Sequence, residues 1–137
     1  MFFKNKETNK ESSYLVKIGS LLVHAAKIDE NYSNAEEEII KKTLLELGAI
    51  KEELNSIVDE AKINESKSNQ ILDFTKEIKS LAEPEKIKII KALWKIIYSD
   101  KDADIYESNL MRRLAGLLYI DSKIMGDIKN EIKKDNF

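Results

Sequence analysis

Residues 87–98 read Ile-Lys-Ile-Ile-Lys-Ala-Leu-Trp-Lys-Ile-Ile-Tyr, and this stretch decides the fold class. Its apolar side chains recur at helical spacing along two adjacent stripes, whereas its lysines form one narrow polar stripe, at positions 88, 91 and 95. That pattern is typical of an α-helix that is buried over most of its circumference and lies at the centre of a helical protein. Pro84 stands just before it, where the first turn of a helix tolerates a missing amide hydrogen.

A second stretch of the same character covers residues 12–28, with two apolar stripes and a polar stripe made of Lys17, Ser20, His24 and Lys27. Further helices are predicted over residues 33–47, 51–63, 71–81, 104–119 and 121–132 from their apolar spacing. We therefore predict an all-α bundle of seven helices in which the first and fifth are central and pack against each other. Residues 1–11 are predicted to be disordered, because residues 4–12 contain no apolar side chain, and residues 12–137 to form one domain.

Composition excludes several classes of function. The 137 residues suit a single domain, and the absence of cysteine excludes disulfides, thiol catalysis and cysteine-based metal sites. A net charge of −2 gives no reason to expect nucleic-acid binding. No uncharged apolar run is long enough to cross a membrane, so we expect a cytoplasmic protein without membrane insertion.

The chain also contains an internal repeat at an offset of 71 positions. At this offset Asp29 aligns with Asp100 and Glu36 with Glu107. Apolar and basic pairs align as well: residues 39–40 with 110–111, and residues 41–42 with 112–113. The repeat predicts two pseudo-symmetric halves.

The repeated segment is an acidic turn between a central helix and the next helix. Oxygen-bearing side chains stand at alternate positions of both copies, and the candidate cation ligands are Asp29, Asn31 and Glu36 in the first copy and Asp100, Asp102, Asp104 and Glu107 in the second. These hard oxygen ligands favour Ca²⁺ or Mg²⁺. The second copy is not an EF-hand loop, because Ile105 and Met111 occupy the positions where that loop needs glycine and glutamate.

Helix capping is the alternative interpretation of the same residues. Ser33 and Glu36 have the spacing of a capping box, and Asp104 with Glu107 is suited to the same task. Capping leaves Asp29 and Asp100 unexplained, since an anion at the carboxyl end of a helix is unfavourable by about 0.3–1 kcal/mol. Both interpretations stay open at this stage.

Three segments of the chain resemble the TerB family of tellurite-resistance proteins. They are residues 21–36, the Phe-Thr-Lys step at residues 74–76, and residues 93–115. The resemblance covers residues 14–132 and implies an all-helical fold with pseudo-two-fold halves, shared with the amino-terminal domain of DjlA co-chaperones. It also implies acidic metal-chelating residues, here Asp29, Glu36, Asp100 and Glu107, and an association with membrane-embedded TerC partners.

Two functions follow as expectations. The first is a non-catalytic TerB-like stress-response domain that binds a divalent cation at the acidic turns. The alternative is a protein-interaction module that docks an acidic partner or membrane protein through the lysine-rich face of residues 88–95, with the acidic turns serving only as helix caps. An enzyme ranks last, because acid–base catalysis needs carboxylates that converge on a pocket, and nothing in the sequence indicates convergence.

Overall fold

The computed structural model describes residues 2–27, 33–68, 72–99 and 105–136, and their side chains over residues 14–27, 33–68, 72–99 and 109–134. Within these ranges the chain forms helices and no strand, which confirms the all-α prediction. The seven α-helices described are α1 (Phe2–Lys27), α2 (Asn34–Glu46), α3 (Leu54–Lys67), α4 (Leu72–Ile78), α5 (Glu83–Tyr98), α6 (Ile105–Leu117) and α7 (Ser122–Asn136); a short 3₁₀ helix, η1 (Lys51–Glu53), precedes α3.

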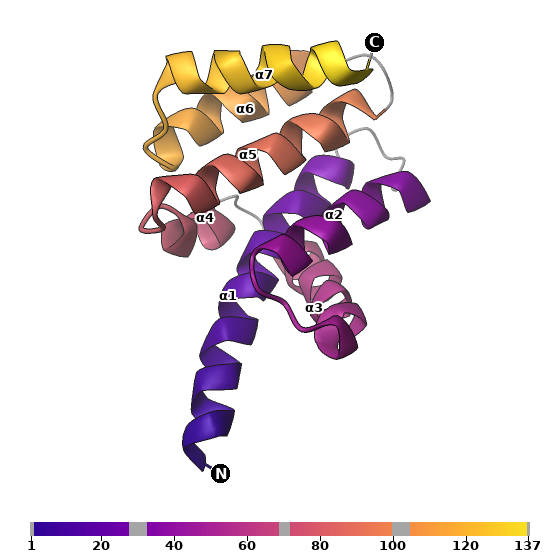
Figure 1. Cartoon of the computed structure of the whole chain (residues 1–137), viewed down its shortest axis with the longest axis vertical. Helices are drawn as coiled ribbons and strands as arrows, with labels where there is room; N and C mark the ends of the chain where they lie inside the picture. The colour runs from indigo at the N-terminus through magenta and orange to yellow at the C-terminus, as the bar shows by residue number, and fades with distance from the viewer. Residues whose placement is uncertain (1, 28–32, 69–71, 100–104, 137) are drawn as a thin grey trace.

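Helices α1 and α5 are central, as predicted (Figure 1). They contact each other, and α1 also packs on α2, α3 and α4, while α5 also packs on α2 and α7. Their apolar stripes supply much of the buried core, including Ile18, Leu22, Ile89, Leu93 and Ile97. Both helices need two apolar stripes because each has neighbours on more than one side.

The most extensive packing of α1 is against α3. A Cβ atom added at Gly19 would lie 3.0 Å from the Cβ of Ala61, so the two helices approach closely there. Ser20, which is fully buried, donates a hydrogen bond to the Val16 carbonyl oxygen at 2.7 Å. It also accepts one from the Asn64 side-chain amide at 3.1 Å. The small residues Gly19 and Ala61 thus allow α1 and α3 to pack closely.

Several predicted helix bounds differ from those of the structure: α4 ends at Ile78, and α7 continues to Asn136. Helix α1 begins at Phe2 rather than Ser12, and its amino-terminal part projects away from the other helices (Figure 1). Its lysine and glutamate residues are good helix formers that extend a helix already nucleated further along. Helix α3 continues to Lys67, through residues expected to form a connector. That the domain begins at residue 12 stays a prediction.

The ends of α2 and α6 share one backbone arrangement. Gly48 has φ 110° and Tyr119, 71 positions later, has φ 57°, so both are left-handed. In each case the backbone amide of the next residue donates a hydrogen bond to the carbonyl oxygen five residues earlier. Ala49 donates to Leu44 at 2.9 Å, and Ile120 donates to Ala115 at 2.9 Å. These are the bonds of a Schellman-type helix end. The repeat is therefore visible locally, while the pseudo-two-fold relation of the whole halves stays a prediction.

Candidate functional site

The acidic turns fall largely outside the described residues. Of the seven candidate cation ligands, Asp29, Asn31, Asp100, Asp102 and Asp104 lie there. Glu107 lies on α6, but its side chain is outside the described set. Glu36 is the candidate whose side chain can be followed.

The Glu36 side chain is 1% exposed at the start of α2. Its Oε1 accepts a hydrogen bond from the Ser33 backbone amide at 2.9 Å, and the Ser33 hydroxyl accepts one from the Glu36 amide at 3.2 Å. This is the reciprocal capping box that the sequence predicts. The carboxylate also lies at the positive end of the helix dipole, which stabilises its charge. One oxygen of Glu36 is therefore committed to the backbone.

The question of a metal site extends to the other described residues. Among the described residues, no cluster of three or more histidine, cysteine, aspartate or glutamate side chains could hold a metal ion. The described part of the first turn forms a helix cap, and the cation site predicted there stays a prediction.

His24 has a partner that the sequence analysis missed. Its Nδ1 lies 3.3 Å from Oε1 of Glu65, whose Oε2 lies 2.8 Å from Nζ of Lys27. The ring of His24 is also tilted against that of Phe74, at 6.4 Å between centroids. The sequence predicts a connector at Glu65, between the helices at residues 51–63 and 71–81. In the structure α3 extends far enough to bring Glu65 beside the polar stripe of α1. These contacts confirm the expectation of a hydrogen-bonded histidine at the surface.

Trp94 is 4% exposed and packs in the core, as predicted. Its ring stacks on Tyr98 at 5.8 Å between centroids, and Nζ of Lys129 lies 5.4 Å from the centroid of the Trp94 ring. The indole Nε1 is buried and finds no hydrogen-bond partner in the described part of the chain.

The lysine stripe of α5 is exposed at two of its three members, Lys88 and Lys95. The third, Lys91, lies 3.6 Å from Oε1 of Glu131 on α7. A fourth lysine, Lys86, was not singled out from the sequence and is 8% exposed. Its Nζ donates to the Leu118 carbonyl oxygen at 2.8 Å, and so places a cation at the negative end of α6.

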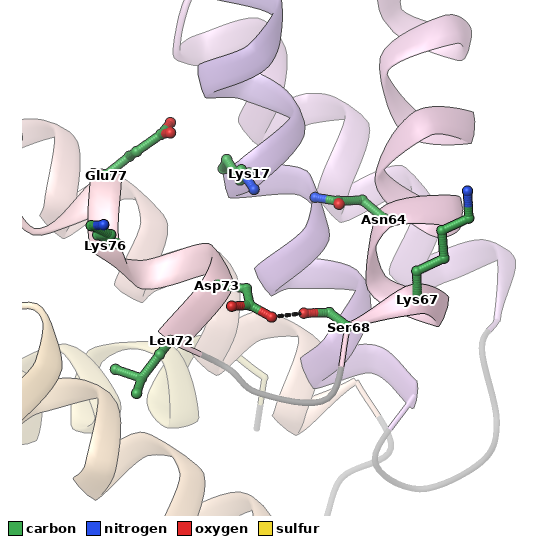
Figure 2. Close-up of a pocket in the computed structure, with 8 residues that line it drawn as sticks. All are labelled: Lys17, Asn64, Lys67, Ser68, Leu72, Asp73, Lys76 and Glu77. Carbon is green, nitrogen blue, oxygen red and sulfur yellow. Dashed lines mark hydrogen bonds between the residues drawn. The ribbon is translucent and has the colours of Figure 1, made fainter.

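A cleft of about 460 Å³ opens between α1, α3 and α4 (Figure 2), lined by Lys17, Asn64, Lys67, Ser68, Leu72, Asp73, Lys76 and Glu77. The Ser68 hydroxyl donates to Oδ2 of Asp73. Three ammonium groups face two carboxylates here, so the cleft favours no single sign of charge.

Tyr14 lies on α1, within the electrostatic influence of Glu77, one of the residues that line the cleft. Burial, with a smaller contribution from the carboxylates of Glu85 and Glu77, raises the pKa of Tyr14 to about 12. Its hydroxyl is buried without a hydrogen-bond partner among the described residues. Tyr14 therefore stays protonated at neutral pH.

The chain matches the family model of the tellurite resistance protein TerB over residues 16–130. No curated protein matches it, and no solved structure does. Among the described helices, none is long and apolar enough to cross a membrane. Because the family match extends from the middle of α1 to α7 and covers most of the chain, the protein belongs to the TerB family.

Proposed function

We propose that this chain is a non-catalytic, cytoplasmic stress-response domain of the tellurite-resistance type that acts by binding. The observation that supports the proposal is the TerB match, which covers the helical body from α1 to α7 rather than one motif. The described surface adds an open hollow between α4 and α6 whose lining includes lysines and apolar side chains but no carboxylate. Such surfaces are suited to recognition rather than to acid–base chemistry.

The bound species is a divalent cation at the second acidic turn. The first turn has Asp29, Asn31 and Glu36 as candidates, but Glu36 is held in a capping box and one of its oxygens is used there. The second turn has four carboxylates within eight residues, Asp100, Asp102, Asp104 and Glu107. Affinity for Ca²⁺ or Mg²⁺ rises with the number of charged oxygen ligands, so the second turn is the stronger candidate.

Calorimetric titration with Ca²⁺ and with Mg²⁺ tests this part. We expect binding by the wild type and by Asp29→Asn, and its loss in the double variant Asp100→Asn with Asp102→Asn. Binding that Asp29→Asn abolishes would reverse the ranking of the two turns. Absence of binding up to millimolar cation would leave capping as the only role of both turns.

The alternative function is a protein-interaction module that uses the lysine face of α5. The exposure of Lys88 and Lys95 on one side of that helix favours it. The family implies a membrane-embedded, TerC-like protein as the partner, met through acidic segments of that protein. Co-purification of the two proteins, with the wild type against the double variant Lys88→Glu with Lys95→Glu, tests this. Undiminished co-purification of the double variant would exclude the face.

A further inference from the structure

A second hollow, of about 360 Å³, lies between α4 and α6 and is here named the α4–α6 groove. It is lined by Leu72, Thr75, Lys76, Lys79, Gly116, Leu117 and Tyr119. A Cβ atom added at Gly116 would meet no atom within 4 Å, so the groove is open above this residue. Leu72 points away from the polar residues of the neighbouring cleft (Figure 2).

The groove collects apolar side chains that the fold does not bury. Five large apolar side chains are exposed in the described part of the chain, and two of them, Leu72 at 45% and Tyr119 at 73%, line this one groove. Exposed apolar surface concentrated in a hollow marks a recognition site more often than single scattered residues do.

Four cationic side chains stand on or just after the two helices that form the groove. Lys76 and Lys79 line the groove from the α4 side. On α6, Arg112 and Arg113 are exposed and precede Gly116 and Leu117 by four residues, so they lie on the same face one turn earlier. None of the four forms an ion pair within the described residues, and no carboxylate lines the groove. The charge of the groove therefore complements an anionic partner.

Tyr119 provides an independent argument. Its backbone is left-handed, with φ 57°, which is unfavourable for a residue with a bulky side chain. Gly48, the residue at the same place in the first half, adopts a left-handed backbone without that penalty. The Tyr119 ring gains little burial in return, although Nζ of Lys86 lies 5.9 Å from its centroid. A strained and exposed aromatic residue at the edge of a groove indicates a binding function.

We infer that the α4–α6 groove binds an acidic amphipathic segment of a partner protein, with one or two apolar side chains seated against Leu72 and Tyr119 and carboxylates facing the lysines and arginines. The concave shape favours a peptide, because a groove can receive a helix or a strand. A flat lipid surface is instead contacted by a projecting part of a protein. The inference goes beyond the proposed function: it concerns a different surface from the acidic turns and from the α5 face.

Selection from a displayed library of short random peptides tests the inference, with the wild-type chain as bait. We expect enriched sequences rich in aspartate and glutamate, with apolar residues at helical spacing. Their affinity should fall at least about tenfold in Tyr119→Ala and in the double variant Lys76→Glu with Arg113→Glu. The double variant Lys42→Glu with Lys51→Glu makes a charge reversal at two exposed lysines elsewhere and should bind as the wild type does. Circular dichroism establishes that each variant is folded.

Other occupants give distinguishable results. Failure to enrich any acidic sequence, or enriched peptides that bind the groove variants equally well, would overturn the inference. The inference would also be overturned if the wild type bound phosphatidylglycerol vesicles and only the groove variants lost this binding. The same holds if the wild type self-associated and only the groove variants did not. Cation titration of the groove variants should match the wild type, so this inference and the proposed function can fail separately.

Discussion

The α1–α3 and α5–α7 interfaces join helices that align in the sequence repeat, but the residues at aligned positions differ in size. In the α1–α3 interface the residues are small and the helices approach closely. Gly19 lies against Ala61, and the buried Ser20 accepts a hydrogen bond from Asn64. At the aligned positions in the second half, 71 residues after Gly19 and Ala61, stand Ile90 and Ile132, both buried. At positions related by the repeat, the first half therefore has small residues in close contact and the second half has large buried side chains.

The largest expected difference between the two halves is at Trp94 and at Val23, the residue 71 positions before it, both of which are buried. Trp94→Ala should lower the free energy of unfolding by about 3–5 kcal/mol, because a large aromatic side chain leaves a cavity. Val23→Ala removes two methyl-sized groups and should lower it by about 1.5 kcal/mol. Urea denaturation measures both. If the two variants lost the same free energy of unfolding, this would contradict the view that large buried side chains stabilise the second half.

A smaller effect is expected at Gly19, where the first half depends on close approach. Gly19→Leu should destabilise by about 1–3 kcal/mol, since the side chain would have to separate α1 from α3. Gly126→Ala is the matched control: a Cβ atom there meets nothing within 4 Å, and the change should stabilise α7 by about 0.5–1 kcal/mol. Thermal denaturation that finds Gly19→Leu as stable as the wild type would show that the close contact is dispensable.

What the sequence predicts well about this chain is local. The capping box of Ser33 and Glu36 and the position of Pro84 each depend on residues a few places apart, and both are found. Burial of Trp94 follows equally from the spacing of its own helix.

What the sequence missed joins distant parts of the chain. Glu65 bonds His24 across 41 positions, and Lys86 bonds the Leu118 carbonyl across 32. Helical periodicity carries no information on which polar residue of one helix faces which polar residue of another. From the sequence alone, Lys86 could therefore not be distinguished from the exposed lysines. The α4–α6 groove was missed for the same reason, because it is formed by two helices far apart in sequence.

The smallest effect concerns the two left-handed helix ends. Gly48→Ala should cost about 1 kcal/mol, because its φ of 110° is strained for any side chain. Tyr119→Gly removes strain but gives the unfolded chain more freedom and loses the contact with Lys86. We therefore expect a net gain of at most about 1 kcal/mol, measured by urea denaturation.

Tyr119→Gly is informative because stability and binding should change in opposite directions. A variant that is as stable as the wild type or more so, yet loses the selected acidic peptides, would mean that the tyrosine is kept for recognition at the expense of the helix end. A loss of stability greater than about 1 kcal/mol would instead make the ring a structural element of the α6 end. The strain at this residue would then cease to be an argument for the groove, which would depend on its charge and its exposed apolar side chains alone.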